Sequence, residues 1–88
     1  MTVRFHSRFL KDLEKLRDVQ LKLSVEELIT KLELANDLRE ITEVKKLKNS
    51  EDAFRIKIGS YRLCFYYNKP TIDLARFLPR KDVYKYFP

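Results

Sequence analysis

Three cationic side chains, Arg55, Lys57 and Arg62, lie in two short segments that flank Gly59-Ser60. The first segment alternates apolar and polar residues and the second is rich in aromatic residues, and both patterns are typical of β-strands. Gly at the first position of a two-residue loop favours a primed turn, so we predict a hairpin. The loop length fixes the register and places Lys57 opposite Arg62 and Arg55 opposite Cys64. The three cations are therefore expected on one face.

This cluster of positive charge needs a physical reason. Like charges that lie directly opposite each other destabilise a sheet by about 0.2–1 kcal/mol per pair. A polyanion bound on this face would offset the repulsion. The alternative interpretation is an ordinary solvated outer face, on which Lys and Arg are common. The other face of the hairpin is apolar and is expected to cover the helices; it consists of Phe54, Ile56, Ile58, Tyr61, Leu63 and Phe65.

The remaining elements follow from periodicity and from residues that favour helix and strand ends. Alternation predicts a first strand at 2–5 and a last strand at 71–77, which Pro79 ends. Apolar residues at helical spacing predict a helix with Ser7 as its N-cap. A second helix is predicted to begin at a capping box formed by Ser24 and Glu27 and to end near residues 36–37. Residues 82–87 are expected to form one helical turn or an irregular tail.

The order β-α-α-β-β-β predicts one α+β domain over residues 1–88. We expect a small antiparallel sheet packed against an N-terminal helical hairpin. No element is predicted between residues 38 and 52, where Val44 and Leu47 are the apolar anchors among charged residues.

The net charge of +6 is unevenly distributed along the chain. Residues 1–43 hold eight basic and nine acidic residues, a net charge of −1, whereas residues 44–88 hold eleven basic and four acidic residues, a net charge of +7. Such asymmetry suggests a polyanionic partner, either nucleic acid or an acidic protein segment. A simple contribution to solubility is the alternative.

Other chemistries find little support in the composition. A lone cysteine excludes an internal disulfide, and with His6 as the only histidine no plausible zinc site remains. No stretch approaches 18 apolar residues and no secretory pattern is present, so we expect a cytoplasmic protein without membrane contact. His6 is more consistent with a capping or surface role than with catalysis. Cys64 is expected among cations that favour its thiolate, but no recognisable catalytic partner accompanies it.

Three motifs in the second half of the chain resemble the RelE/ParE toxin superfamily. They are the segment Lys45-Lys46-Leu47-Lys48, the strand that leads through Gly59-Ser60 into Tyr61-Arg62, and the closing run Arg80-Lys81-Asp82-Val83-Tyr84. The length and the order of elements are also similar. The resemblance implies a RelE-like toxin of a type II toxin–antitoxin system, which enters the ribosomal decoding site and cleaves messenger RNA. It also implies a cognate antitoxin as partner and no metal or cofactor.

The family's functional positions can be transferred residue by residue. The catalytic set implied here is Arg55, Lys57, Arg62, Arg80 and Tyr84, and the further basic residues expected to contact RNA are Lys45, Lys46, Lys48, Arg76 and Lys81. Many relatives have Gly-His where this chain has Leu78-Pro79, so a histidine acid or base is absent there. The spacing from Arg80 to Tyr84 is also shorter than in the best-studied cleaving branch.

Two other functions are compatible with the resemblance. A ParE-type toxin would inhibit DNA gyrase by binding, and a degenerate member would only bind its antitoxin. Gyrase-directed relatives generally lack the full cationic set, which favours the nuclease. Cleavage through the RNA 2′-hydroxyl needs a base, and arginine cannot serve as one. Lys57 is then the candidate, because neighbouring cations disfavour its protonated form. Tyr84 could stack on a base or donate a proton to the leaving oxygen.

Overall fold

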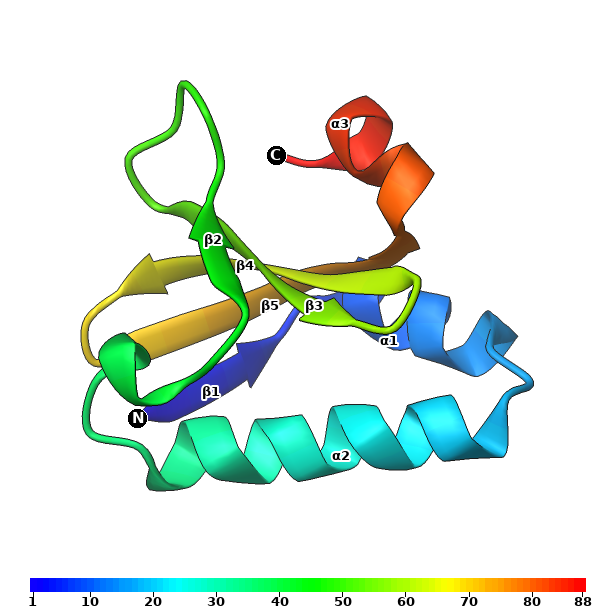
Figure 1. Ribbon diagram of the computed structural model, residues 1–88, viewed down its shortest axis with the longest axis horizontal. Helices are drawn as coiled ribbons and strands as arrows, with labels where there is room; N and C mark the ends of the chain where they lie inside the picture. Colours follow the sequence, from blue (N-terminus) through cyan, green and yellow to red (C-terminus); the bar gives the residue numbers. More distant parts are fainter.

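A mixed five-stranded sheet forms the centre of the molecule (Figure 1). The computed structural model describes residues 1–88. Its strands are β1 (Thr2–Phe5), β2 (Val44–Lys46), β3 (Ala53–Ile58), β4 (Tyr61–Asn68) and β5 (Thr71–Pro79), in the order β1-β5-β4-β3-β2. The predicted α+β fold is confirmed. The structure adds the strand β2, which sequence patterns did not indicate, and pairs β1 with β5 in parallel.

Two helices, α1 (Ser7–Lys15) and α2 (Val19–Leu34), cover one face of this sheet (Figure 1). The short 3-10 turns η1 (Leu38–Glu40) and η2 (Arg80–Asp82) precede β2 and the terminal helical turn α3 (Val83–Tyr86), respectively. Figure 1 places α3 on the side of the sheet away from α2. None of the helices combines the length and apolar character needed to span a membrane.

The predicted hairpin and its register are confirmed. Lys57 pairs with Arg62, and Arg55 pairs with Cys64. Gly59 has a φ of +58°, which the turn requires and glycine adopts without steric cost. An added Cβ at Gly59 would meet no atom within 4 Å, so the need for glycine comes from the backbone conformation alone.

The two helices begin at different residues from those predicted. The N-cap of α1 is His6, and Ser7 is its first helical residue. The N-cap of α2 is Asp18, whose carboxylate accepts a hydrogen bond from the Leu21 N–H at 3.1 Å. Ser24 lies inside this helix and its hydroxyl donates to the Gln20 carbonyl, so the predicted capping box is wrong. Asp18 caps the helix ahead of the predicted cap at Ser24, and Leu21 in the first turn packs against the core.

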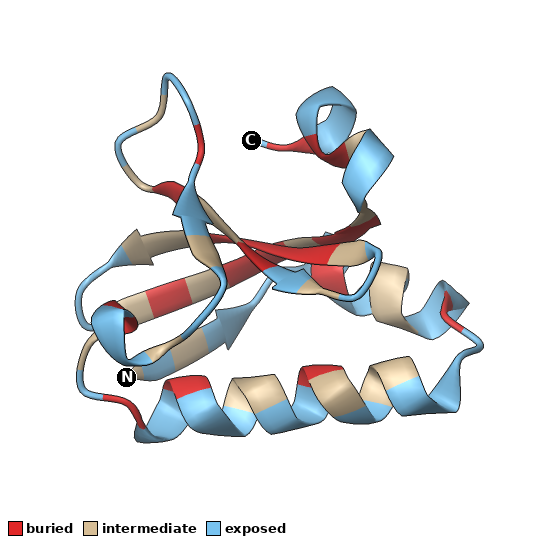
Figure 2. Cartoon of the chain, in the orientation of Figure 1, coloured by how far each residue is buried: buried red, intermediate tan, exposed pale blue.

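The sheet is buried on both faces, but to different extents. The main cluster fills the space between sheet and helices, and Figure 2 shows the buried residues of α2 on its sheet-facing side. The predicted apolar face of the hairpin lies in or against this cluster. A smaller cluster covers part of the opposite face and consists of Leu47, Ala53, Cys64, Ala75, Leu78, Val83 and Phe87. The C-terminal segment therefore docks on the face that carries the cations.

This docking changes the environment of Cys64. Its side chain is fully buried, and burial raises the pKa of the thiol to about 12 although Arg55, Arg76 and Arg62 act in the opposite direction. The expectation of a cation-favoured thiolate is therefore wrong, because desolvation by the terminal segment outweighs the neighbouring charges.

The corrected start of α2 gives a stability prediction. Asp18→Ala removes the N-cap hydrogen bond and is expected to lower the free energy of unfolding by about 0.5–2 kcal/mol. Ser24→Ala, which removes only an intrahelical hydroxyl contact, is the matched control and should change it by less than about 0.5 kcal/mol. Urea denaturation followed by circular dichroism measures both. A larger loss for Ser24→Ala than for Asp18→Ala would restore the capping box at Ser24.

Candidate active site

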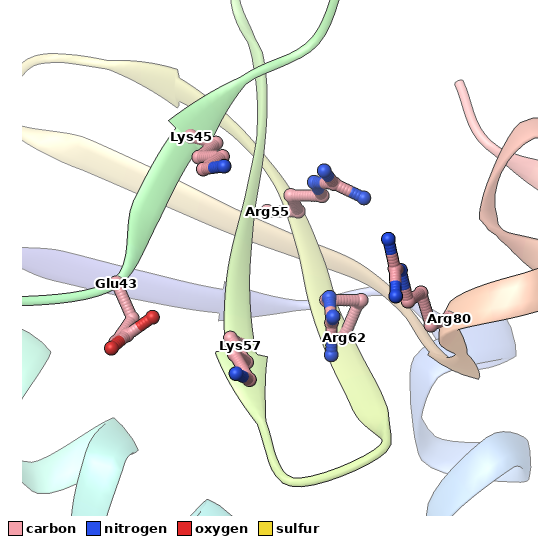
Figure 3. Close-up of a pocket in the computed structure, with 6 residues that line it drawn as sticks. All are labelled: Glu43, Lys45, Arg55, Lys57, Arg62 and Arg80. Atoms are coloured by element: carbon pink, nitrogen blue, oxygen red, sulfur yellow. The ribbon is translucent and has the colours of Figure 1, made fainter.

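A pocket of about 240 Å³ lies on the hairpin face that points away from the helices (Figure 3). No hydrophobic residue lines it. Its walls consist of Glu43, Lys45, Arg55, Lys57, Arg62 and Arg80, which we call the cationic pocket. Four of the five residues predicted to be catalytic from the sequence thus meet in one place.

Strand pairing and one loop contact bring these side chains together. Lys45 on β2 lies opposite Arg55 on β3, and Lys57 on β3 lies opposite Arg62 on β4. Arg80 joins them because its backbone N–H donates to the Ser60 carbonyl at 2.9 Å, which holds the start of η2 beside the hairpin turn. The convergence is therefore built into the backbone rather than into flexible side chains.

Arg62 is the most constrained member of the cationic pocket. It is the one charged residue among the buried residues, with 8% of its surface exposed. Its Nη1 donates to the carbonyls of Gly59 and Tyr61 at 3.0 and 2.8 Å, so it also braces the turn. Burial, followed by the nearby charges of Arg55 and Arg80, lowers the pKa of its guanidinium. The structure forms no ion pair to any of the pocket's cations, and Glu43 is the single acidic residue beside them, so the pocket keeps a net positive charge.

Tyr84 lies next to the pocket rather than in it. The Arg55 guanidinium carbon lies 5.9 Å from the centroid of the Tyr84 ring, within the range of a cation–π contact. Tyr84 as a whole is 66% exposed. It borders a second, more open hollow of about 710 Å³, which shares Arg55 and Arg80 with the cationic pocket and also includes Ser60, Pro79 and Lys81. A phosphate in the first pocket would therefore leave an attached base within reach of an aromatic ring.

The residues expected to contact RNA occupy different places. Lys45 lines the cationic pocket and Lys81 lines the adjoining hollow. Lys46 follows Lys45 on β2, so its side chain points to the other face of the strand, and Lys48 is exposed just after β2.

Arg76 lies outside the cationic pocket. Its Nε and Nη2 donate to the Asp12 carboxylate at 2.8 and 3.1 Å, and Asp12 also accepts from the backbone N–H of Phe77. This pairing raises the pKa of Arg76. The guanidinium carbon of Arg76 also lies 5.7 Å from the Tyr86 ring centroid, so this arginine links α1 to the C-terminal segment.

Glu43 is the pocket residue that sequence reasoning missed. It directly precedes β2, and its backbone carbonyl accepts a hydrogen bond from the Lys57 N–H at 3.2 Å. Its φ is +64°, in the left-handed region. No pattern in the sequence marks the turn at Glu43, and β2 has only three residues. His6, in contrast, is exposed and borders a separate hollow with Arg76 and Tyr86.

Comparison with known proteins gives one consistent result. A family model described as the ParE toxin of the type II toxin–antitoxin system parDE matches residues 3–84. The chain is 37% identical to Toxin RelE3 of Methanocaldococcus jannaschii over the full length of both proteins, and 32% identical to Putative toxin RelE1 of the same organism over 94% of the chain and 93% of the relative.

Solved structures agree with the sequence relatives. The toxin-like chain in the RelB–RelE antitoxin–toxin complex from Methanococcus jannaschii superposes with a TM-score of 0.82 at 30% identity, covering 97% of this chain and 99% of that one. The archaeal RelE–RelB complex from Pyrococcus horikoshii OT3 gives a TM-score of 0.73 at 26% identity, covering 93% and 97%. The resemblance seen in the sequence motifs is therefore confirmed, and the chain belongs to the RelE/ParE family as a toxin of a type II toxin–antitoxin system.

Proposed function

We propose that this toxin is a ribosome-dependent endoribonuclease that cleaves messenger RNA during translation, without a metal or a cofactor. The observation that supports this most directly is the convergence of Arg55, Lys57, Arg62 and Arg80 in one pocket with Tyr84 beside it. Cleavage by the RNA's own 2′-hydroxyl builds negative charge on phosphorus-bound oxygens, and fixed cations stabilise that charge.

The three arginines have binding and stabilising roles in this reaction. Arginine stays protonated at working pH and cannot accept a proton. Arg62 is held by the turn, so its remaining donors are pre-positioned for a phosphate. Removing one such donor typically lowers a rate by about 10²–10³. Lys57, on the exposed side of the pocket, adds a compact positive charge.

The bound RNA strand is expected to extend from the cationic pocket into the adjoining hollow. Lys45, Lys46, Lys48 and Lys81 are exposed and can contact flanking phosphates. Arg76 is expected to contribute least, because its guanidinium already binds Asp12. One face of the Tyr84 ring meets Arg55, and the exposed ring can stack on a nucleobase.

A cognate antitoxin is the second partner that we propose. The two solved relatives are named as complexes of RelE with RelB. An acidic or amphipathic antitoxin segment that folds on the basic sheet in the cytoplasm would neutralise the charge of Lys57 and Arg62 and block access to RNA.

Cleavage in a reconstituted translation reaction tests the proposed activity. We expect the wild-type toxin to cut messenger RNA at defined positions on ribosomes, as mapped by primer extension, and Arg80→Ala to reduce single-turnover cleavage by about 10²–10³. Lys11→Ala, at an exposed position of α1, is the control. A toxin that leaves ribosome-bound messenger RNA intact but inhibits gyrase supercoiling would be a ParE-type inhibitor. One that does neither and still binds an antitoxin would be a degenerate member.

Salt dependence tests whether the pocket binds phosphates. Removing one phosphate-binding side chain is expected to reduce the slope of log affinity for RNA against log salt by about 0.7–0.9. The variant to use carries Arg55→Ala, Lys57→Ala and Arg80→Ala, since Arg62 also holds the hairpin turn. We expect its slope to fall by about 2–3 in fluorescence-anisotropy titrations. An unchanged slope would remove these three residues from the interface.

The two possible roles of Tyr84 can be separated by substitution. Tyr84→Phe keeps the ring and removes the hydroxyl, and we expect RNA affinity to hold while single-turnover cleavage falls by about 10², as for loss of a general acid. Tyr84→Ala should in addition weaken RNA binding by about 1–3 kcal/mol, the usual contribution of one stacked base. Full cleavage by Tyr84→Phe would limit the residue to stacking.

A further inference from the structure

Glu43 is the one acidic residue that lines the cationic pocket (Figure 3). The carboxylate is exposed and faces a site that otherwise presents only lysine and arginine. For a surface that only binds phosphate, an anion at this position weakens binding. Its presence therefore suggests a chemical role that lysine and arginine do not fill.

The backbone at Glu43 supports the same conclusion. Three residues in the chain have a left-handed φ, namely Glu43 at +64°, Asn49 at +61° and Gly59 at +58°. Glycine and asparagine adopt this conformation readily, whereas a longer side chain such as glutamate is strained there. The chain uses the favourable residue types at the other two turns and an unfavourable one at the edge of the pocket. Strain of this kind is typical of functional sites.

Position within the pocket indicates what the carboxylate could do. Glu43 lies across from Lys57, to which its backbone is hydrogen-bonded. Figure 3 shows Glu43 and Arg80 on opposite sides of the pocket, with Arg55, Lys57 and Arg62 between them. Tyr84 borders the adjoining hollow with Arg80 and Arg55 and lies against the Arg55 guanidinium, whereas Glu43 does not line that hollow. A phosphate held by the central cations would therefore have a carboxylate on one side and a phenol on the other.

We propose that Glu43 is the general base of the cleavage reaction, which rests on the nuclease activity proposed above. The Glu43 carboxylate takes the proton of the RNA 2′-hydroxyl, and the 2′-oxygen attacks the adjacent phosphorus. The bond from phosphorus to the 5′-oxygen breaks, and the 5′-oxygen takes the proton of the Tyr84 hydroxyl. The products are a 2′,3′-cyclic phosphate and a 5′-hydroxyl, and exchange with water returns both side chains to their starting states.

This assignment removes a difficulty in giving the same task to Lys57. An amine acts as a base only when it is neutral, and a lysine side chain is ordinarily charged at neutral pH. A carboxylate is already deprotonated at neutral pH and is ready to accept a proton. In-line displacement needs a base and an acid on opposite sides of the phosphorus, and Glu43 and Tyr84 border different sides of the central cations. Lys57 then stabilises charge together with the arginines.

Substitution at Glu43 tests the assignment through two independent readouts. Glu43→Gln keeps the size of the side chain and removes its basicity. We expect single-turnover cleavage of ribosome-bound messenger RNA to fall by about 10² or more. RNA affinity should hold or increase, because a negative charge leaves a phosphate-binding pocket. Glu51→Gln, in the exposed loop between β2 and β3, is the matched control for loss of one acidic charge and should cleave normally.

A second variant separates catalysis from folding. Glu43→Gly relieves the left-handed backbone, so the protein should be at least as resistant to thermal unfolding as the wild type while cleavage is abolished. Lys57→Arg, which keeps its charge, should reduce cleavage less than Glu43→Gln does. Normal cleavage by Glu43→Gln, or a larger loss of cleavage for Lys57→Arg, would reject Glu43 as the general base but not the proposed nuclease activity. If the wild-type toxin does not cleave messenger RNA, both the proposed nuclease activity and the role of Glu43 as its general base are rejected.

Discussion

The two-residue turn at Gly59-Ser60 determines the register of β3 and β4, and both functions of the hairpin depend on that register. With Ile58 opposite Tyr61, one face supplies apolar residues to the main cluster and the other supplies Arg55, Lys57 and Arg62 to the pocket. A slip of one residue would exchange the two faces, exposing the apolar side chains and burying the charges. Burial of the apolar face therefore enforces the repulsive arrangement of the cations.

The terminal segment places a buried apolar cluster on the same face of the sheet as these cations. Val83 and Phe87 pack on the sheet beside Cys64, which is fully buried, so the strand partner of Arg55 belongs to a buried apolar region. Charge interactions are stronger near such regions than in bulk water. Arg62 is the most buried of the pocket's cations, and two backbone carbonyls accept hydrogen bonds from its Nη1. The same hydrogen bonds brace the turn, so the Arg62 side chain and the turn stabilise each other.

The sequence was most informative where a pattern is local and repeated. Alternation with a short glycine turn was sufficient to place Lys57 opposite Arg62, and the motifs at Arg80 and Tyr84 led to the correct family. The strand β2 was missed because its three residues are held by pairing with β3 rather than by any pattern of their own. Glu43 was missed with it, since its place in the pocket comes from that pairing and from one turn.

Errors of a second kind came from contacts between segments far apart in the chain. Nothing near Cys64 or Arg76 in the sequence shows that the last residues fold back over the sheet or that Asp12 reaches β5. The predicted start of α2 is too late because a serine followed three residues later by a glutamate, here Ser24 and Glu27, also occurs inside helices. In each case the local pattern was compatible with more than one structure, and a contact with a distant part of the chain determined which one forms.

The separation of the two buried clusters has a consequence for the dynamics of the molecule. The eleven-residue main cluster holds the helices and sheet together, whereas the terminal segment joins the smaller seven-residue cluster only through Val83 and Phe87. Segments anchored by few buried side chains open with a lower free energy than the whole domain. Amide protons of residues 83–87 should therefore exchange with solvent through local opening while those of β4 require global unfolding. Tyr84 lies in this terminal segment. The fraction of molecules that hold Tyr84 beside the cationic pocket therefore depends on the free energy of local opening and not on the free energy of global unfolding.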